Sequence, residues 1–271
     1  MNVLADHLSN DVKKNLFGNA DYNMLWSCQA YPQFCYRVHV PDCYNPEEKT
    51  PLELMIIIHG AGCAVEKYVE VTQEWADLHK VAVLAPLFPS GLIDHDDFNS
   101  YKLLSYDGIR YDFVLLAMIQ EMMKRYPGVK GERFLLFGHS GGGQYVNRFY
   151  LVHPDKLKAV SISAPGRPTF IDFETDYFWG IRNFRQLFDK DFDLAAVRKV
   201  PVQIMVGVKD VKYIGESPYG TNRVERMKSL LKNFQANGVQ HTELEIIPGI
   251  EHVDGDSERI VACTKFFEKV L

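Results

Sequence analysis

The sequence predicts an α/β protein with a mostly parallel central sheet flanked by helices. From about residue 50 onward, short apolar runs alternate with longer stretches of helical periodicity, which is the pattern of strands joined by crossover helices. Several runs are apolar at consecutive positions, as in strands buried on both faces. A chain of 271 residues, 46% of them hydrophobic, is long enough to bury one large core of this kind.

Seven strands are expected from the apolar runs, at residues 36–40, 54–59, 81–86, 134–137, 159–163, 202–206 and 244–247. Four helices are expected between and after them, at residues 109–126, 143–152, 222–235 and 257–270. The first helix carries Phe113, Leu116, Ile119 and Met123 at helical spacing and should be stopped by Pro127-Gly128. The last should begin after Ser257 as its N-cap and bury Ile260, Cys263, Phe266 and Phe267.

The stretch from Arg167 to Lys199 departs from this alternation and is interpreted as an insertion. We therefore expect a core domain made of residues 1–166 and 200–271 and a cap or lid made of residues 167–199. The insertion is rich in aromatic residues. They either pack as ordinary core or form a face that lines a substrate pocket, in which case Phe178 and Trp179 would contact the substrate.

Composition and charge exclude several classes of protein. The net charge is −5 and no long basic run occurs, which argues against nucleic acid as a partner. The apolar runs are far shorter than the ~20 residues of a membrane-spanning helix, so no membrane span is expected. Met1–His7 lacks the pattern of a secretory signal, which favours a cytoplasmic protein. Whether the chain forms a homodimer stays open.

The cysteines are interpreted as thiols. There are five of them, an odd number without a C-x-x-C pair, which favours neither a disulfide framework nor a zinc ribbon. If the protein were secreted, a bridge from Cys35 to either Cys28 or Cys43 would remain open.

The strongest chemical signal is Gly138-His139-Ser140-Gly141-Gly142, a G-x-S-x-G pattern between an expected strand and an expected helix. In that setting the serine sits on a sharp turn, and side chains at positions 138 and 142 would collide, so glycine is required at both. The hydroxyl of Ser140 should then project above the carboxyl edge of the sheet. We interpret Ser140 as the nucleophile.

A serine nucleophile needs a base, and the base needs an acid that fixes its tautomer. His252 follows the last expected strand and is the preferred base. His139 adjoins Ser140 and cannot easily turn back onto it. Asp210 ends the strand region 202–210 and is the preferred acid, with Asp254 and Asp256 as alternatives.

The oxyanion formed during acyl transfer needs two backbone N–H donors. Gly141, directly after the nucleophile, is expected to supply one. The run His59-Gly60-Ala61-Gly62 follows an apolar strand and favours Ala61 as the second donor, with Gly62 as the alternative. Gly62 and His139 are also expected beside the bound substrate.

Together these residues resemble the α/β-hydrolase superfamily, over roughly residue 35 to the C-terminus. The first motif reads HGAG, where hormone-sensitive-lipase-like esterases have HGGG. The resemblance implies an acyl-enzyme mechanism with Ser140, His252 and Asp210 as the triad and with Ala61 and Gly141 as the oxyanion hole. It also places residues 167–199 where that superfamily often carries its lid.

The expected function is hydrolysis of an ester, thioester or lactone of a small hydrophobic substrate, without a cofactor. Carbon–carbon bond hydrolysis and acyl transfer to an alcohol use the same triad and remain alternatives, as does a non-catalytic binding module. The run Asp94-His95-Asp96-Asp97 offers metal-ligand types, but neighbouring side chains in an extended loop point apart. We interpret it as a solvated loop and expect no metal site.

Overall fold

The computed structural model describes residues 24–271. The segment Met1–His7, whose sequence predicts no secretory signal, lies outside these residues. Among the helices of residues 24–271, none combines the length and apolar composition that crossing a bilayer requires. The five cysteines are free thiols, as the sequence predicts.

Within residues 24–271, eight strands form one sheet in the order β1-β2-β4-β3-β7-β8-β9-β10. The strands are β1 (Trp26–Ser27), β2 (Cys35–His39), β3 (Glu53–Ile58), β4 (Val81–Leu87), β7 (Phe134–His139), β8 (Leu157–Ser163), β9 (Val202–Gly207) and β10 (Thr242–Ile247). Strands β3 to β10 of this sheet are parallel, while β2 is antiparallel to β4 and β1 to β2. The seven expected strands are all present, with ends shifted by two residues at most.

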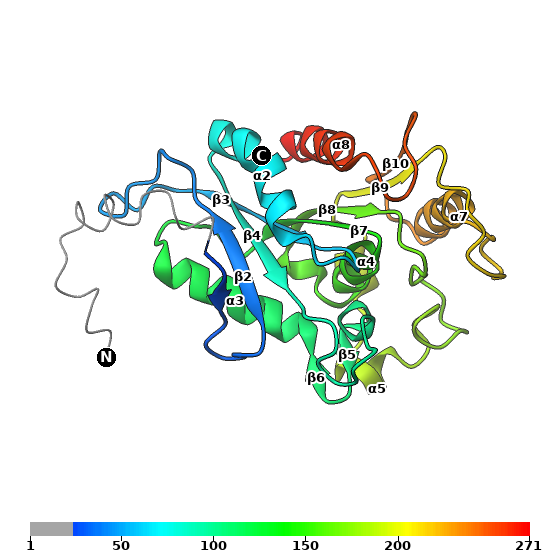
Figure 1. The fold of residues 1–271 in the computed structure, drawn as a ribbon. Coiled ribbons are helices and arrows are strands. Elements are labelled where there is room, and N and C mark those ends of the chain that lie inside the picture. The colour runs from blue at the N-terminus through cyan, green and yellow to red at the C-terminus, as the bar shows by residue number, and fades with distance from the viewer. Residues whose placement is uncertain (1–23) are drawn as a thin grey trace.

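Helices cover both faces of the sheet and create three layers (Figure 1). One face packs against α2 (Val65–His79) and α8 (Asp256–Glu268), and the other against α3 (Tyr111–Arg125), α4 (Gly141–Val152) and α7 (Arg223–Ala236). Alternation along β3 explains the two cores. Met55 and Ile57 join the core under α2 and α8, whereas Leu54, Ile56 and Ile58 join the other core.

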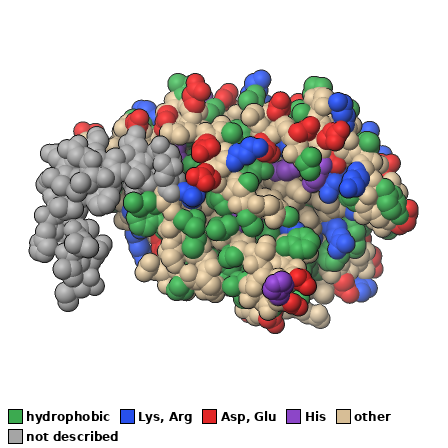
Figure 2. All heavy atoms as spheres, viewed as in Figure 1, with side chains coloured by type: hydrophobic (Ala, Val, Ile, Leu, Met, Phe, Trp, Pro, Cys, Tyr) green, Lys and Arg blue, Asp and Glu red, His purple; other side chains and the backbone are tan. Residues whose placement is uncertain are grey.

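Shorter elements connect the layers. Near the carboxyl edge of the sheet lie the 3₁₀ helix η2 (Ser100–Leu103) and the hairpin of β5 (Ser105–Tyr106) and β6 (Ile109–Arg110). The 3₁₀ helix η3 (Pro154–Lys156) precedes β8. Basic and acidic side chains are interspersed over the face shown in Figure 2.

The expected insertion at residues 167–199 contains two short helices, α5 (Phe184–Phe188) and α6 (Leu194–Val197). Phe170, Phe184 and Phe188 are buried in the same hydrophobic cluster as the sheet face under α3, α4 and α7. Part of this segment therefore packs as ordinary core. Its role as a cap stays a prediction.

The helix α2 was not expected from the sequence. Its buried face consists of Val65, Tyr68, Val69, Thr72 and Ala76. These positions recur at helical spacing, so the sequence carried the signal of an amphipathic helix that the prediction missed.

The expected helix α3 is present, but of the four residues at helical spacing that predict it only Ile119 is fully buried. The helix buries the side that carries Val114, Leu115 and Met118, whereas Phe113 is 44% exposed. Apolar residues occupy every position from 113 to 119, so helical spacing alone does not distinguish the two sides.

The N-cap expected for α8 is wrong. The helix begins at Asp256 after Gly255, which adopts a left-handed conformation with a φ of 75°, and Ser257 lies within the first turn. Glycine reaches this conformation without the steric cost of a Cβ. The expected buried face of α8 is confirmed, since Ile260, Cys263 and the two phenylalanines are buried.

Two neighbouring leucines on α3 test which side of this helix is buried. Leu115 is fully buried, whereas Leu116 is partly exposed. Replacing Leu115 with alanine should lower the free energy of unfolding by about 2–5 kcal/mol, because it leaves a cavity in the core. The Leu116→Ala change should cost clearly less. Urea denaturation of the two variants compares them, and equal costs would contradict the observed burial.

Candidate active site

Ser140 sits on the turn between β7 and α4, at the carboxyl edge of the sheet. Its φ of 55° and ψ of −111° lie outside the ordinary helical and strand regions. A Cβ on Gly138 would come within 2.5 Å of the carbonyl oxygen of Gly142, and a Cβ on Gly142 would collide with the carbonyl oxygen of Ile58. Glycine is therefore sterically required at both positions, as the sequence predicts.

His252 lies between Ser140 and Asp210. Its Nε2 is 2.8 Å from Ser140 Oγ, and its Nδ1 is 2.7 Å from Asp210 Oδ2. A carboxylate only accepts hydrogen bonds, so Nδ1 carries the proton and Nε2 accepts from the serine hydroxyl. The structure thus brings together the three residues expected as nucleophile, base and acid.

Asp210 is 1% exposed, and its carboxylate accepts hydrogen bonds from His252 and Arg223. While Oδ2 accepts from His252, Oδ1 accepts from Arg223 Nη1 at 3.2 Å. Burial alone would raise the pKa of Asp210. The hydrogen bond and charge of His252, together with Arg223, outweigh burial and hold this pKa below its ordinary value. Asp210 is therefore ionised at neutral pH.

The alternative acids have other partners. Asp254 Oδ1 accepts from the backbone N–H of Glu251, and Asp256 Oδ2 accepts from Lys67 Nζ. Neither carboxylate bonds to the ring of His252.

The side chains of His139 and Arg259 hold the backbone of His252 by hydrogen bonds. His139 is buried, and its Nε2 donates to the carbonyl of His252 at 2.9 Å while its Nδ1 accepts from Ser163 Oγ at 3.0 Å. Arg259 Nη2 donates to the carbonyls of Glu251 and His252. These contacts place His139 against the loop that carries His252, whose backbone it holds.

The loop after β3 lies beside Ser140. A Cβ on Gly60 would be 3.8 Å from Ser140 Cβ, and a Cβ on Gly141 would be 3.3 Å from the backbone N of Ala61. Within residues 24–271, the N–H groups of Ala61 and Gly141 donate no hydrogen bond to another group. The two expected oxyanion donors are therefore adjacent and available.

His59 anchors this loop. It is fully buried, its Nε2 accepts from the backbone N–H of Phe88 at 3.0 Å, and its Nδ1 donates to the carbonyl of Gly60 at 2.6 Å. Burial lowers the pKa of His59 to about 4. The ring is therefore neutral at neutral pH, and its one N–H donor and one acceptor nitrogen match these two partners.

A hollow of about 320 Å³ lies near this site, and Ser140, His252 and Asp210 are not part of its lining. Its lining includes Asn99, Gln144, Ile214 and three arginines, Arg167, Arg223 and Arg226. Gln144 N–H bonds to the carbonyl of Ser140, and Arg223 bonds to Asp210. Gln144 thus lies one helical turn after Ser140, and Arg223 connects the hollow to Asp210.

The remaining expected substrate contacts lie at different places. Gly62 is exposed in the loop after β3. Phe178 and Trp179 are partly exposed and do not line the hollow, but Arg167 lies over Phe178 and Arg226 over Trp179, at 5.6 and 5.3 Å from the ring centroids. No contact with a substrate is assigned to them by this geometry.

Three residues near the site were missed by sequence reasoning. Arg223 contacts Asp210, while Tyr101 and Lys102 close the space in front of Gly141, where a Cβ would meet Tyr101 Oη at 2.5 Å and Lys102 Cε at 2.8 Å. Arg223 offers a sequence signal. It is the first residue of a helix, where a positive charge is unfavourable, which indicates a tertiary partner. Tyr101 and Lys102 offer none.

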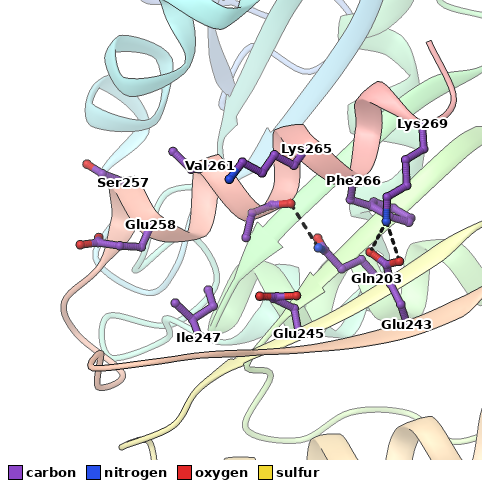
Figure 3. A pocket seen from close by; sticks show the side chains of 11 residues that line it. Gln203, Glu243, Glu245, Ile247, Ser257, Glu258, Val261, Lys265, Phe266 and Lys269 are labelled. Atoms are coloured by element: carbon purple, nitrogen blue, oxygen red, sulfur yellow. Dashed lines mark hydrogen bonds and ion pairs between the residues drawn. The ribbon is translucent and has the colours of Figure 1, made fainter.

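A larger hollow of about 450 Å³ lies elsewhere, between β10 and α8 (Figure 3). Within it Lys269 pairs with Glu243, and Gln203 donates to the carbonyl of Ala262. Among the described residues, no histidine or cysteine lines it. This hollow therefore lacks an imidazole base or a thiol nucleophile.

Comparison with known proteins identifies the fold. No model of a protein family matches the chain. No curated protein matches it. Solved structures do match, and they include hydrolases and esterases.

One match is poly(aspartic acid) hydrolase-1 from Sphingomonas sp. KT-1, with 20% identity, a TM-score of 0.72 and coverage of 89% of this chain and 96% of that one. Another is a poly(3-hydroxybutyrate) depolymerase from Bordetella parapertussis, with 20% identity, a TM-score of 0.71 and coverage of 97% and 95%. An S-formylglutathione hydrolase from Agrobacterium tumefaciens matches with 15% identity, a TM-score of 0.58 and coverage of 87% and 88%. This chain has the α/β-hydrolase fold, as its motifs predict.

The low pKa of His59 makes the stability of the protein sensitive to acid. Between about pH 6.5 and pH 4 the unfolded chain binds a proton at this residue and the folded protein does not. The stability that the neutral ring supplies is therefore present above pH 6.5 and is lost as the pH falls toward 4, by at most ~3 kcal/mol.

Urea denaturation of the parent protein and of His59→Gln measures this effect. The parent should be the more stable protein at about pH 7, and the difference should shrink at about pH 4.5, because the variant has no imidazole to protonate. A difference that is the same at both pH values would contradict the buried neutral state.

Proposed function

We propose that the protein is a serine hydrolase that cleaves an ester, thioester or lactone through an acyl-enzyme. The observation that carries the proposal is the continuous hydrogen-bonded chain from Ser140 Oγ through His252 to Asp210. The fold supports the proposal, because these three hydrogen-bonded residues lie at the carboxyl edge of the sheet, as in α/β-hydrolases.

In the first step, Ser140 Oγ attacks the acyl carbon while its proton moves to His252 Nε2. A bond forms between Oγ and that carbon, and the carbonyl oxygen becomes an oxyanion that accepts from the N–H groups of Ala61 and Gly141. Asp210 keeps the proton on Nδ1 and stabilises the imidazolium. The imidazolium then protonates the leaving oxygen or sulfur as its bond to carbon breaks.

In the second step, water attacks the acyl-enzyme and gives its proton to His252. The bond between the acyl carbon and Oγ breaks, and His252 returns the proton to Ser140. The protein ends in its starting state, and no cofactor takes part in the proposed cycle. The hydrophobic substrate and the lid expected from the sequence remain predictions.

A fluorophosphonate tests the nucleophile directly. The parent protein should gain one covalent adduct at Ser140, measured by intact mass and peptide mapping. Ser140→Ala should gain none, and labelling of His252→Ala should be slowed by about 10³-fold or more, because the hydroxyl then has no base. A folded parent protein that is not labelled would overturn the proposal.

The acid is tested by comparing two aspartates. Asp210→Asn should lower kcat for a p-nitrophenyl ester by about 10³–10⁴-fold, since an amide favours the wrong tautomer of His252. Asp254→Asn is the control, because that carboxylate bonds only to the N–H of Glu251. Equal losses in the two variants would remove Asp210 from its proposed role.

A further inference from the structure

The hollow near Ser140 has three arginines among the residues that line it, in a protein whose net charge is −5. Arg167, Arg223 and Arg226 belong to its lining, and among the described residues that line it there is no aspartate or glutamate. Lys102 lies next to it, since its Nζ donates to Oδ1 of the lining residue Asn99 at 2.8 Å.

Few carboxylates compensate these charges. Arg226 donates through Nε, Nη1 and Nη2 to the backbone carbonyls of residues 220, 166 and 215, and to no carboxylate. Arg223 contacts Asp210 through Nη1, while its buried Nε has no partner within residues 24–271. Arg167 is exposed and lies over the ring of Phe178.

The cations are close enough to repel one another. Burial lowers the pKa of Arg226, and the charges of Arg167 and Arg223 lower it further, although the charge of Glu225 opposes the change. Burial also lowers the pKa of Lys102 to about 8, even though Asp97 opposes that change, and Arg148 and Arg167 add to the lowering. Bringing like charges together is unfavourable unless an anion joins them.

The protein holds this arrangement in place from beneath. Arg148 of α4 is fully buried and donates to the backbone carbonyls of Lys102 and Arg167 and to Thr169 Oγ1. One side chain therefore fixes the two segments that carry Lys102 and Arg167. When the backbone that carries the donors is fixed before binding, less entropy is lost as the ligand binds.

We propose that this hollow binds an anionic group of the substrate, a carboxylate or a phosphate, while Ser140 attacks the neighbouring acyl carbon. The anion would lie between Arg167 and Arg223, whose planar guanidinium groups match the oxygens of either anion. This assignment rests on the proposed function and adds the class of substrate to it. It replaces a purely hydrophobic substrate with an ester that carries a negative charge.

Matched substrates test the proposal. The p-nitrophenyl monoester of adipic acid carries a free carboxylate, and p-nitrophenyl hexanoate has the same chain length without it. The parent protein should show a kcat/KM at least about tenfold higher for the adipate ester at low salt, a preference that salt weakens. A kcat/KM for the hexanoate ester that equals or exceeds that for the adipate ester would overturn the proposal.

Variants of Arg167 test whether its positive charge determines the preference for the adipate ester. In Arg167→Gln the preference for the adipate ester should fall by about tenfold or more, whereas Arg167→Lys should keep most of it, because the charge is retained. Arg185→Gln is the control. Arg185 is 77% exposed and pairs with the exposed Asp191. A preference unchanged in Arg167→Gln would contradict the assignment.

Inhibition distinguishes the two anions. Free adipate and phenyl phosphate, at constant ionic strength, are compared as competitive inhibitors of hexanoate ester hydrolysis, and the tighter one identifies the anion. No inhibition by either would overturn the proposal. Hydrolysis of the hexanoate ester and labelling of Ser140 report the proposed function separately, so each failure is recognised by itself.

Discussion

The close approach of the first turn of α4 to the ends of β3 and β8 is the constraint on which the site depends. A Cβ on Gly142 would collide with the carbonyl oxygen of Ile58, and a Cβ on Gly143 with that of Ser163. Without side chains at these positions the helix can begin directly above the sheet. Ser140 then takes its strained conformation and faces His252.

Buried polar contacts hold the other groups around this turn. His59 anchors the loop that carries Ala61, and His139 anchors the backbone of His252. Burial lowers the pKa of both imidazoles, so both are neutral at neutral pH, which matches their hydrogen-bond partners. His59 and His139 thus hold backbone segments in place, whereas His252 is the one of the three that bonds to Ser140 Oγ.

Sequence patterns predicted the features whose cause is local. The glycines around Ser140 and the consecutive apolar residues of the parallel strands reflect sterics and burial that act within a few residues, and the structure has both. The side of α3 that is buried depends instead on which helix face meets the sheet. Apolar residues on both sides of the helix do not determine this choice.

The positive charge around the site could not be predicted from local sequence patterns. Arg148, Arg167, Arg223 and Lys102 come from four separate segments, and only the fold brings them together. The aromatic residues of the segment 167–199 suggested a hydrophobic pocket. In the structure several of them pack into the core, and three arginines are among the residues that line the hollow near Ser140.

The central claim is that Ser140 carries the acyl group during turnover. Its most direct test is mass spectrometry of protein quenched with acid while it hydrolyses p-nitrophenyl acetate, followed by peptide mapping. The account predicts one acetyl group on the peptide that contains Ser140, absent after the substrate is exhausted. Turnover with no acetyl group on that peptide, or with the group on another residue, would contradict it.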